Sequence, residues 1–293
     1  MKTRKPVVAG QFYPASRQSC LADIQRCIES GTLGADLPST VLAGIVPHAG
    51  WTFSGPTAAL VFSAIKQRSY NITTFIICGA CHGYFGPRPA VDDHDQWETP
   101  LGHIAIDTHL RDALVQDGLV KVEPAAHHQE HSIEVQVPFI QFLFPEAKIL
   151  PILVPPTATP VEFGERLAER VSASKSHVAY IGSTDLTHYG PRYGFTPMGA
   201  GPEGLRWASE VNDRRFIDLA VRLEATELLV GAMDNGYACG PGAAAAVVSA
   251  AQKAGAGRGF LLAYTTSNEI LLKEMGTISR ESVGYVAIVF GPS

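Results

Sequence analysis

The chain has 293 residues, of which 46% are hydrophobic and 17% are charged, and its formal net charge is -5 at pH 7. This composition is typical of a globular protein with a sizeable core. The negative charge argues against binding to nucleic acid through phosphate contacts, and no apolar run approaches the length of a membrane span. We therefore expect neither nucleic acid nor a membrane as a partner.

The first ten residues are basic but lack the long apolar region of a secretory signal peptide. The chain also has five cysteines, an odd number that fits reduced thiols better than a framework of disulfides. Both observations favour a cytoplasmic protein.

Apolar runs and amphipathic segments alternate along the chain, with turn-forming residues between them. The alternation predicts an α/β fold, and neither an internal repeat nor a linker divides residues 1–293 into separate domains. Pro151 lies within one predicted strand and indicates that this strand is an edge or irregular one. Strands are expected at 41–46, 74–79, 103–106, 148–154, 178–182, 260–265 and 283–290, and helices at 17–29, 57–66, 107–116, 159–172, 205–219, 226–235 and 243–254.

Three of the predicted strands are followed by a histidine. His48 follows the first strand, His82 the second, and His188 follows the strand at 178–182 together with Asp185. Loops at the carboxyl ends of parallel strands form the binding sites of open α/β sheets. A lone histidine is more often structural than a ligand, but three such strand endings favour a functional site. If the first two strands are parallel neighbours, His48 and His82 should face one pocket.

His48, His82 and Cys239 are candidate metal ligands, since each is a nitrogen or sulfur donor expected in a loop. Two imidazoles and a thiolate suit zinc, iron or copper, and three protein ligands leave a coordination position open for chemistry. Cys239 also lies just before the helix expected at 243–254, where the helix dipole favours a thiolate. The structural alternative is a cluster of neutral histidines satisfied by hydrogen bonds, with Cys239 as a core residue.

Four further residues near these loops are candidates for other roles in the same site. His188 could move protons, and Asp185 could fix the tautomer of that histidine or complete a ligand set. Trp51 and Tyr189, which adjoin the strand-end motifs, could form the walls of a substrate pocket.

The segment His127-His128-Gln129-Glu130-His131 fits the inverted zinc-protease pattern H-x-x-E-H, which requires a helix through all five residues. Pro124 lies too close before it, so we expect the helix to begin near Glu130 or His131 instead. Glu130 and His131 could then reach a pocket as acid, base or hydrogen-bond partner. The structural alternative is that Glu130 only interacts favourably with the helix dipole.

Taken in order, the motifs of this chain resemble those of the Memo family, whose founding member is a vertebrate mediator of cell motility. The resemblance extends from the opening Ala9-Gly10-Gln11-Phe12-Tyr13 to the final strand. It is specific because six motifs occur in the order of the family: Pro47-His48-Ala49-Gly50-Trp51, Gly79-Ala80-Cys81-His82, Glu98-Thr99-Pro100-Leu101, Glu130-His131-Ser132-Ile133-Glu134, Ser183-Thr184-Asp185-Leu186-Thr187-His188-Tyr189-Gly190 and Cys239-Gly240.

The resemblance implies a single three-layer α/β/α domain with a mostly parallel or mixed sheet. That fold resembles the class III extradiol dioxygenases, enzymes of the protocatechuate 4,5-dioxygenase type that use non-haem Fe(II). It also implies a metal set of His48, His82 and Cys239, with Asp185 and His188 beside the pocket and His188 in the acid/base position; Glu130 and His131 would lie near it. The dioxygenases have a carboxylate where this chain has Cys239, and a thiolate shifts the metal preference toward copper, zinc or thiolate-bound iron.

Two functional hypotheses follow from the motifs and the resemblance. The first is a metal-dependent oxidoreductase that binds one ion, iron or copper with zinc as the alternative, and acts on a small molecule. The second is a non-catalytic metal- or peptide-binding protein that reuses the dioxygenase fold. A metal-activated hydrolase is a third alternative, and a homo-oligomer is compatible with all three.

Overall fold

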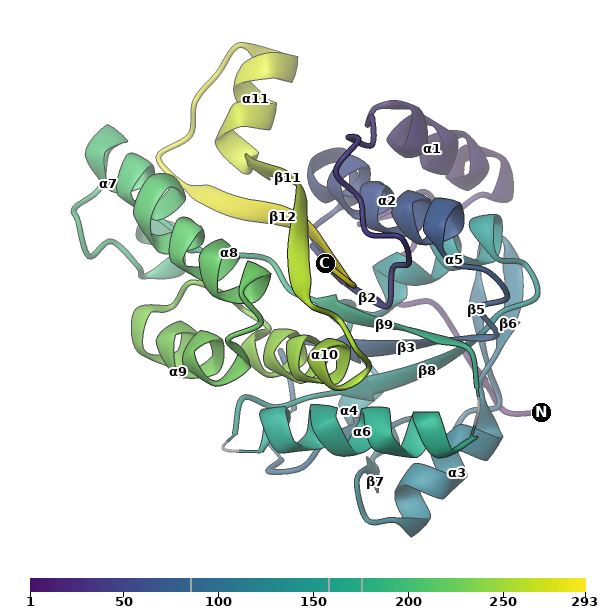
Figure 1. Ribbon diagram of the computed structural model, residues 1–293. Coiled ribbons are helices and arrows are strands. Elements are labelled where there is room, and N and C mark those ends of the chain that lie inside the picture. Colours follow the sequence, from purple (N-terminus) through teal and green to yellow (C-terminus); the bar gives the residue numbers. More distant parts are fainter. Residues whose placement is uncertain (85, 158, 175) are drawn as a thin grey trace.

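The computed structural model describes residues 1–84, 86–157, 159–174 and 176–293 (Figure 1). The strands are β1 (Thr3–Arg4), β2 (Ala43–Val46), β3 (Thr74–Gly79), β4 (Ala90–Val91), β5 (Gln96–Thr99), β6 (Gly102–Ala105), β7 (Lys121–Val122), β8 (Lys148–Leu153), β9 (Val178–Ser183), β10 (His188–Tyr189), β11 (Arg258–Thr266) and β12 (Ser282–Gly291). The α-helices are α1 (Arg17–Glu29), α2 (Trp51–Arg68), α3 (Thr108–Gln116), α4 (Pro124–His127), α5 (Val137–Leu143), α6 (Pro160–Ser174), α7 (Pro202–Trp207), α8 (Asp213–Val221), α9 (Ala225–Asn235), α10 (Pro241–Lys253) and α11 (Ser267–Met275).

A nine-stranded mixed sheet lies between two layers of helices. The order is β10-β12-β2-β9-β3-β8-β4-β7, with β11 also paired to β12, and the strands β2, β9, β3 and β8 are parallel. Helices α1, α2 and α5 cover one face, and α6, α9 and α10 lie on the other (Figure 1). All residues of β2 and β3 are buried, as expected for parallel strands that are covered on both faces. The predicted α/β fold with a mixed sheet is confirmed.

Strands β2 and β3 are parallel, but they are not neighbours. Strand β9 lies between them, with Gly182 opposite both Ile45 of β2 and Cys78 of β3. The loop after β9 therefore emerges between the loops that follow β2 and β3. This order brings Asp185 close to His48, which the succession of strands along the chain did not indicate.

Strand β8 is not an edge strand, because β3 pairs with one side of it and shorter segments flank the other. The N–H of Asp107 donates to the carbonyl of Ile149, and β4 pairs with Ile152 and Leu153. Since backbone groups two residues apart point the same way in a strand, the N–H that Pro151 lacks would point outward between these contacts. Pro151 is therefore accommodated inside the sheet without loss of a ladder hydrogen bond.

Two helices begin at other residues than the sequence indicated. Helix α2 begins at Trp51 instead of residue 57 and contains Pro56 in its interior. The segment after Glu130 becomes helical only at the 3₁₀ turn Glu134–Gln136, because the Glu130 carboxylate accepts the N–H groups of His131 and Ser132. These side-chain bonds hold a non-helical loop, as acidic residues often do near helix starts.

Two other departures concern the second half of the chain. The helix expected at 205–219 is interrupted by a π-helical turn at Ala208–Asn212, between α7 and α8. Helix α11 was not predicted, and none of its residues is buried. A helix without a buried face has no apolar stripe to reveal it in the sequence.

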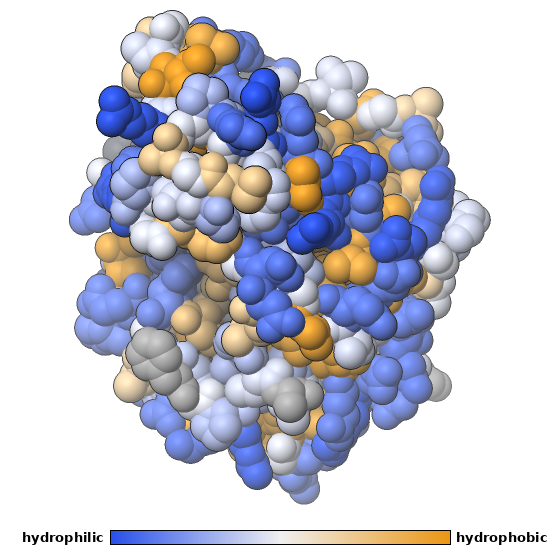
Figure 2. All heavy atoms as spheres, turned by 90° about the vertical axis from the view of Figure 1, so that its left-hand side faces the viewer, coloured by the Kyte–Doolittle hydropathy of each residue, from blue (hydrophilic) through white to orange (hydrophobic). Residues whose placement is uncertain are grey.

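Hydrophilic side chains cover most of the face that carries α7, α8 and α9, with apolar patches between them (Figure 2). Within the described ranges, the structure has no helix that is both long and apolar enough to cross a membrane.

The N-terminal segment is held against the core by a buried ion pair. Arg4 Nη1 lies 2.7 Å from Glu134 Oε2, and the two side chains are only 5% and 1% exposed. The same carboxylate accepts the N–H groups of Val7 and Val8 and the hydroxyl of Tyr13. These bonds fix the course of residues 4–13, which bring Phe12 to the histidine loops.

We expect Glu134→Ala to lower the free energy of unfolding by about 3–5 kcal/mol, because it leaves the buried Arg4 guanidinium without its counter-charge. Urea denaturation measures this change. Glu98→Ala, which removes the partner of the exposed Lys5 and His103, is the control and should leave the midpoint nearly unchanged. A wild-type midpoint for Glu134→Ala would contradict the anchoring role of the pair.

Candidate metal centre

Three histidines from different loops meet beyond the carboxyl ends of the central strands. His48 follows β2, His82 follows β3, and His131 lies in the loop before the 3₁₀ turn. The ring centroids are 5.2 Å apart for His48 and His82, 5.5 Å for His48 and His131, and 4.7 Å for His82 and His131. One nitrogen from each ring lies within 4.8 Å of the others, which is close enough for the three to hold one ion.

The hydrogen bonds of His48 determine its tautomer. Its Nδ1 lies 3.1 Å from Ser183 Oγ, and that hydroxyl donates its own hydrogen to the carbonyl of Ser132 at 2.7 Å. Ser183 can therefore only accept from the ring, so Nδ1 carries the hydrogen and Nε2 keeps a free lone pair. Burial, reinforced by the nearby His82 and His131, holds the pKa of His48 well below its usual value, so the ring stays neutral.

His82 is oriented in the same way by Glu130. Its Nδ1 lies 3.0 Å from Glu130 Oε1, and its backbone N–H donates to Glu130 Oε2 at 3.0 Å. Although burial favours the neutral ring, the carboxylate raises the pKa of His82 above its usual value. The Nδ1 hydrogen points to Glu130 and Nε2 is left for a ligand, which is the carboxylate–histidine arrangement found around bound metals.

Cys239 approaches the cluster from the loop before α10. Its Sγ lies 3.2 Å from His48 Nε2 and accepts the N–H of Asp185 at 3.3 Å. Backbone bonds hold this loop, because the N–H of Cys239 donates to the carbonyl of Asp185 and that of Gly240 to Thr184 Oγ1. Burial first, and then Asp185, raise the pKa of the thiol, so a cation at His48 Nε2 would be needed to stabilise the thiolate.

Two donor sets share the oriented Nε2 atoms of His48 and His82. The third donor is either Cys239, which lies against His48, or His131, whose pKa is lowered by burial and by His82. Neutral imidazoles and a sulfur donor are the chemistry that zinc, iron and copper accept, so the residues fit a resident metal ion. The three histidines of this site could thus hold a metal ion.

Asp185 and His188 lie on the other side of the cluster. Asp185 Oδ1 accepts the N–H of His48 at 2.7 Å, and burial raises the pKa of this carboxyl. His188 Nδ1 lies 3.0 Å from the carbonyl of Leu186, which can only accept. Nδ1 therefore carries a hydrogen, which leaves Nε2 as the other nitrogen of this ring.

A cavity of about 630 Å³ opens beside the histidines. His48, His82, His131, Asp185 and His188 all line it, so the structure brings these predicted residues together. Aromatic side chains supply much of the remaining wall, namely Phe12, Phe53, Tyr193 and Tyr285. Arg192, Ser267, Ser279 and Glu281 add further polar groups, so the cavity combines aromatic walls with polar side chains, as small-molecule sites do.

Trp51 and Tyr189, predicted as pocket walls, lie in the core instead. Trp51 is 2% exposed, packs 4.5 Å from the ring of Phe139 and donates its Nε1 hydrogen to the carbonyl of Val135. Tyr189 is fully buried, and its hydroxyl donates to the carbonyl of Gly199. Each adjoins a site histidine along the chain, but neighbouring residues point in different directions.

Sequence reasoning missed the aromatic wall and Ser183. Phe12 lies 4.7 Å from the ring of His131 and is brought there by the N-terminal anchor, far from the histidine motifs in sequence. Ser183 directly follows Gly182 in the chain, and a hydroxyl at a strand end beside Asp185 was the signal that could have revealed it.

A second group of potential ligands, Asp92, Asp93 and His94, is already internally paired. Asp92 Oδ1 lies 2.6 Å from His94 Nδ1, and Asp92 Oδ2 accepts the Trp97 indole hydrogen at 2.8 Å. Asp93 forms an ion pair with Lys2. We therefore assign these residues a structural role.

The strand that bears His188 is supported by a buried carboxyl group. Asp213 Oδ1 accepts the N–H of Thr187 at 2.9 Å, and Oδ2 accepts the Tyr264 hydroxyl at 2.7 Å. Burial raises the pKa of Asp213 to about 7. Asp213 follows the π-helical turn directly, and such turns often occur near functional sites.

We expect Glu130→Gln to weaken metal binding about 10- to 100-fold, because the amide orients His82 without adding negative charge. Titration with Zn²⁺ against a competing chelator measures the affinity without redox side reactions. Glu146→Gln, at an exposed position, is the matched control and should bind like wild type. Equal affinities for both variants would show that Glu130 does not act on the metal ligand.

The raised pKa of Asp213 predicts a pH-dependent stability. A carboxyl whose folded-state pKa lies near 7, against 3.8 when unfolded, holds its proton more tightly in the folded protein. Its contribution to the free energy of unfolding therefore falls as pH rises from about 4 to 7, by at most about 1.4 kcal/mol per pH unit. Urea unfolding of wild type and Asp213→Asn at pH 5, 6 and 7 measures this effect. The free energy of unfolding of wild type relative to Asp213→Asn should fall as pH rises from 5 to 7. A constant difference would contradict the shift.

Comparison with known proteins reveals extensive similarity along the chain. The sequence model of the family described as "Memo-like protein" matches residues 4–289. A MEMO1 family protein of Thermococcus kodakarensis is 36% identical, covering 98% of this chain and 99% of that protein. MEMO1 family proteins of Thermococcus onnurineus and Methanopyrus kandleri are 34% and 35% identical, and each alignment covers 98% of this chain, with 99% and 98% of those proteins.

Among solved structures, an uncharacterized protein of Escherichia coli K12, JW3007, has a similar fold. The TM-score is 0.52 at 14% sequence identity, covering 85% of this chain and 99% of that one. At this identity the likeness concerns the fold alone.

Proposed function

The chain belongs to the Memo family, and on this premise we propose that it is a metal-dependent oxidoreductase that acts on a small molecule. The observation that carries the proposal is the pair of oriented imidazoles. Both His48 and His82 have Nδ1 engaged by a fixed partner, which leaves Nε2 as the donor atom, beside the Cys239 sulfur in the case of His48, at one end of a cavity of about 630 Å³. Two Nε2 atoms available as donors beside a cavity favour a metal ion that keeps open coordination positions.

The proposed metal ligands are His48, His82 and Cys239, and iron or copper is the preferred ion, with zinc as the alternative. The sulfur of Cys239 lies against His48 Nε2, so one ion could contact both atoms after a small displacement of the side chains. A thiolate makes the site softer than one with two histidines and a carboxylate.

The five cysteines form no disulfide, which supports a cytoplasmic location.

The other residues of the site would position a substrate and move its protons. A bound metal would supply Lewis acidity and, as iron or copper, electron transfer. His188 lines the cavity with its Nδ1 held by the carbonyl of Leu186, and its Nε2 would act as general base toward a substrate hydroxyl. Asp185 would hold the His48 loop in place, and Glu130 would orient His82, so both act as positioning residues. His131 and Phe12 would form one wall around the bound molecule.

The metal set is tested by comparing wild type, Cys239→Ser and His131→Ala after anaerobic purification without an affinity tag. We expect about one equivalent of metal per chain in wild type and in His131→Ala, and loss of most metal in Cys239→Ser. Elemental analysis measures the content, and circular dichroism controls for folding. Loss in His131→Ala with retention in Cys239→Ser would assign the three-histidine set instead. If wild type binds no metal even after anaerobic reconstitution, the proposal fails.

The reaction type is tested by oxygen uptake of the iron-loaded protein with a panel of catechols. We expect His188→Ala to keep its metal and to lose turnover by about 10²- to 10⁴-fold, the usual contribution of a general base. Metal loss in that variant would contradict the role given to His188. Metal binding without turnover on any reducing substrate would favour the alternative function, a non-catalytic metal- or peptide-binding protein.

A further inference from the structure

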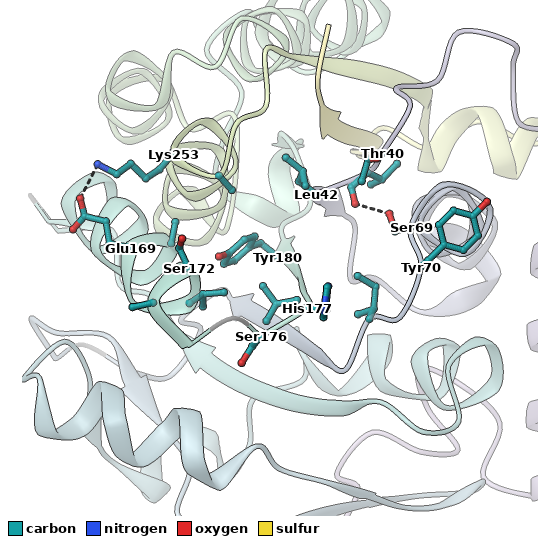
Figure 3. A pocket seen from close by; sticks show the side chains of 17 residues that line it. Thr40, Leu42, Ser69, Tyr70, Glu169, Ser172, Ser176, His177, Tyr180 and Lys253 are labelled. Carbon is teal, nitrogen blue, oxygen red and sulfur yellow. Dashed lines mark hydrogen bonds and ion pairs between the residues drawn. The ribbon is translucent and has the colours of Figure 1, made fainter.

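A second cavity, of about 640 Å³, lies at the opposite edge of the sheet from the metal centre (Figure 3). It is lined by residues at the amino ends of the strands, including Leu42 before β2, Ile72 before β3 and Val178 at the start of β9. The metal centre follows the carboxyl ends of the same strands, roughly 20 Å away for strands of this length. The two cavities share no lining residue.

Three helices end at this second cavity. Ser69 follows the last residue of α2, Ser172 and Ala173 lie in the last turn of α6, and Lys253 and Ala254 end α10. The carboxyl end of each helix carries free carbonyl groups and about half a negative charge. Because the helices connect parallel strands, their negative ends gather at this edge, and a cation there is stabilised.

The charged side chains of the cavity are one glutamate and one lysine, with His177 beside them, so the preference for a cation comes from the helix ends. Figure 3 shows Tyr180 in the middle of the lining, with Glu169 and Lys253 at one end and Ser69 and Tyr70 at the other. Glu169 Oε1 already pairs with Lys253 Nζ at 2.6 Å. Among the described lining residues, Lys253 is the only lysine or arginine.

Hydroxyl groups and apolar surface complete the lining. Thr40, Ser172, Ser176 and Tyr180 contribute hydroxyls, which can accept hydrogen bonds from an ammonium group. Val41, Leu42, Ile72, Val171 and Ala168 contribute apolar surface beside them. Tyr180 also lines the cavity but is only 3% exposed, so it contributes little accessible surface. A ligand that fits this lining has a cationic group and an apolar body.

We propose that this cavity is a second binding site, separate from the metal centre, for a small organic ammonium ion with an apolar body. The cationic group interacts with the helix carboxyl ends and with Glu169, and the body packs on the apolar lining. An anion of the same shape is disfavoured by the same dipoles.

The proposal is tested with three probes of similar shape, namely phenethylammonium, 2-phenylethanol and phenylacetate. Chemical-shift titration of the ¹⁵N-labelled full chain measures the binding of each. We expect phenethylammonium to bind more tightly than 2-phenylethanol and phenylacetate least, with shifts around residues 40–42, 69–72 and 176–180. Equal binding of the three probes, shifts confined to the histidine cavity, or no binding of phenethylammonium would overturn the proposal.

Substitutions in the ion pair test the charge preference by its sign. Glu169→Gln should weaken phenethylammonium binding about two- to fivefold, and Lys253→Gln should strengthen it by a similar factor, because it frees the carboxylate. Identical dissociation constants in both variants would overturn the electrostatic argument. Both residues lie on the surface, so the variants should fold.

Filling the cavity tests its location. Ser172→Trp places an indole in the lining from the exposed last turn of α6, and we expect it to abolish binding. Glu162→Trp is the matched control, because it adds an indole to an exposed position in the first turn of the same helix, outside the cavity lining. Binding that survives Ser172→Trp would place the ligand elsewhere and overturn the proposal. If Ser172→Trp does not fold, the two charge variants decide.

Discussion

The arrangement of the metal centre depends on the buried carboxylate of Glu130. It accepts the ring and backbone N–H groups of His82 and the N–H groups of His131 and Ser132. Burial alone would raise its pKa, but these bonds and the His82 ring hold the pKa of Glu130 well below its usual range. One charged group thus joins the loop after β3 to the segment before α5. Without it, the two irregular loops would lose the hydrogen bonds that hold them in a fixed position relative to each other.

His48 is also oriented through a hydrogen bond at Nδ1, although its partner, the hydroxyl of Ser183, is neutral. The Ser183 hydroxyl donates its hydrogen bond to the carbonyl of Ser132, and the N–H of Ser132 is bound by Glu130. The segment that Glu130 holds therefore also fixes the tautomer of His48. The two imidazoles are therefore set by one short stretch of chain, Glu130–Ser132. Because one segment orients both rings, the nitrogens of two histidines from separate loops lie close enough to hold one ion.

The sequence indicated the histidines because strand ends are easy to recognise, whereas the partners that orient them are not. His48, His82 and Asp185 each follow an apolar run, and this local pattern can be recognised whatever the order of the strands in the sheet. The insertion of β9 between β2 and β3 depends on long-range pairing that local patterns do not encode. Phe12 reaches the cavity only through the anchor of Arg4 on Glu134. Trp51 is apolar and adjoins His48, yet the start of α2 turns it into the core.

The polarity of the parallel strands gives the two edges of the sheet opposite electrostatic character. At the edge of the metal centre, α2 and α10 begin, at Trp51 and Pro241, and their positive ends oppose a cation. Two buried carboxyl groups, Glu130 and Asp185, lie on the side opposed to that field, and burial together with Asp185 raises the pKa of the Cys239 thiol. A metal ion at this edge would therefore be stabilised by side chains placed against the helix dipoles. At the other edge the helices present their carboxyl ends, so the same dipoles favour a cation there, and the one carboxylate among the described lining residues, Glu169, is paired with Lys253.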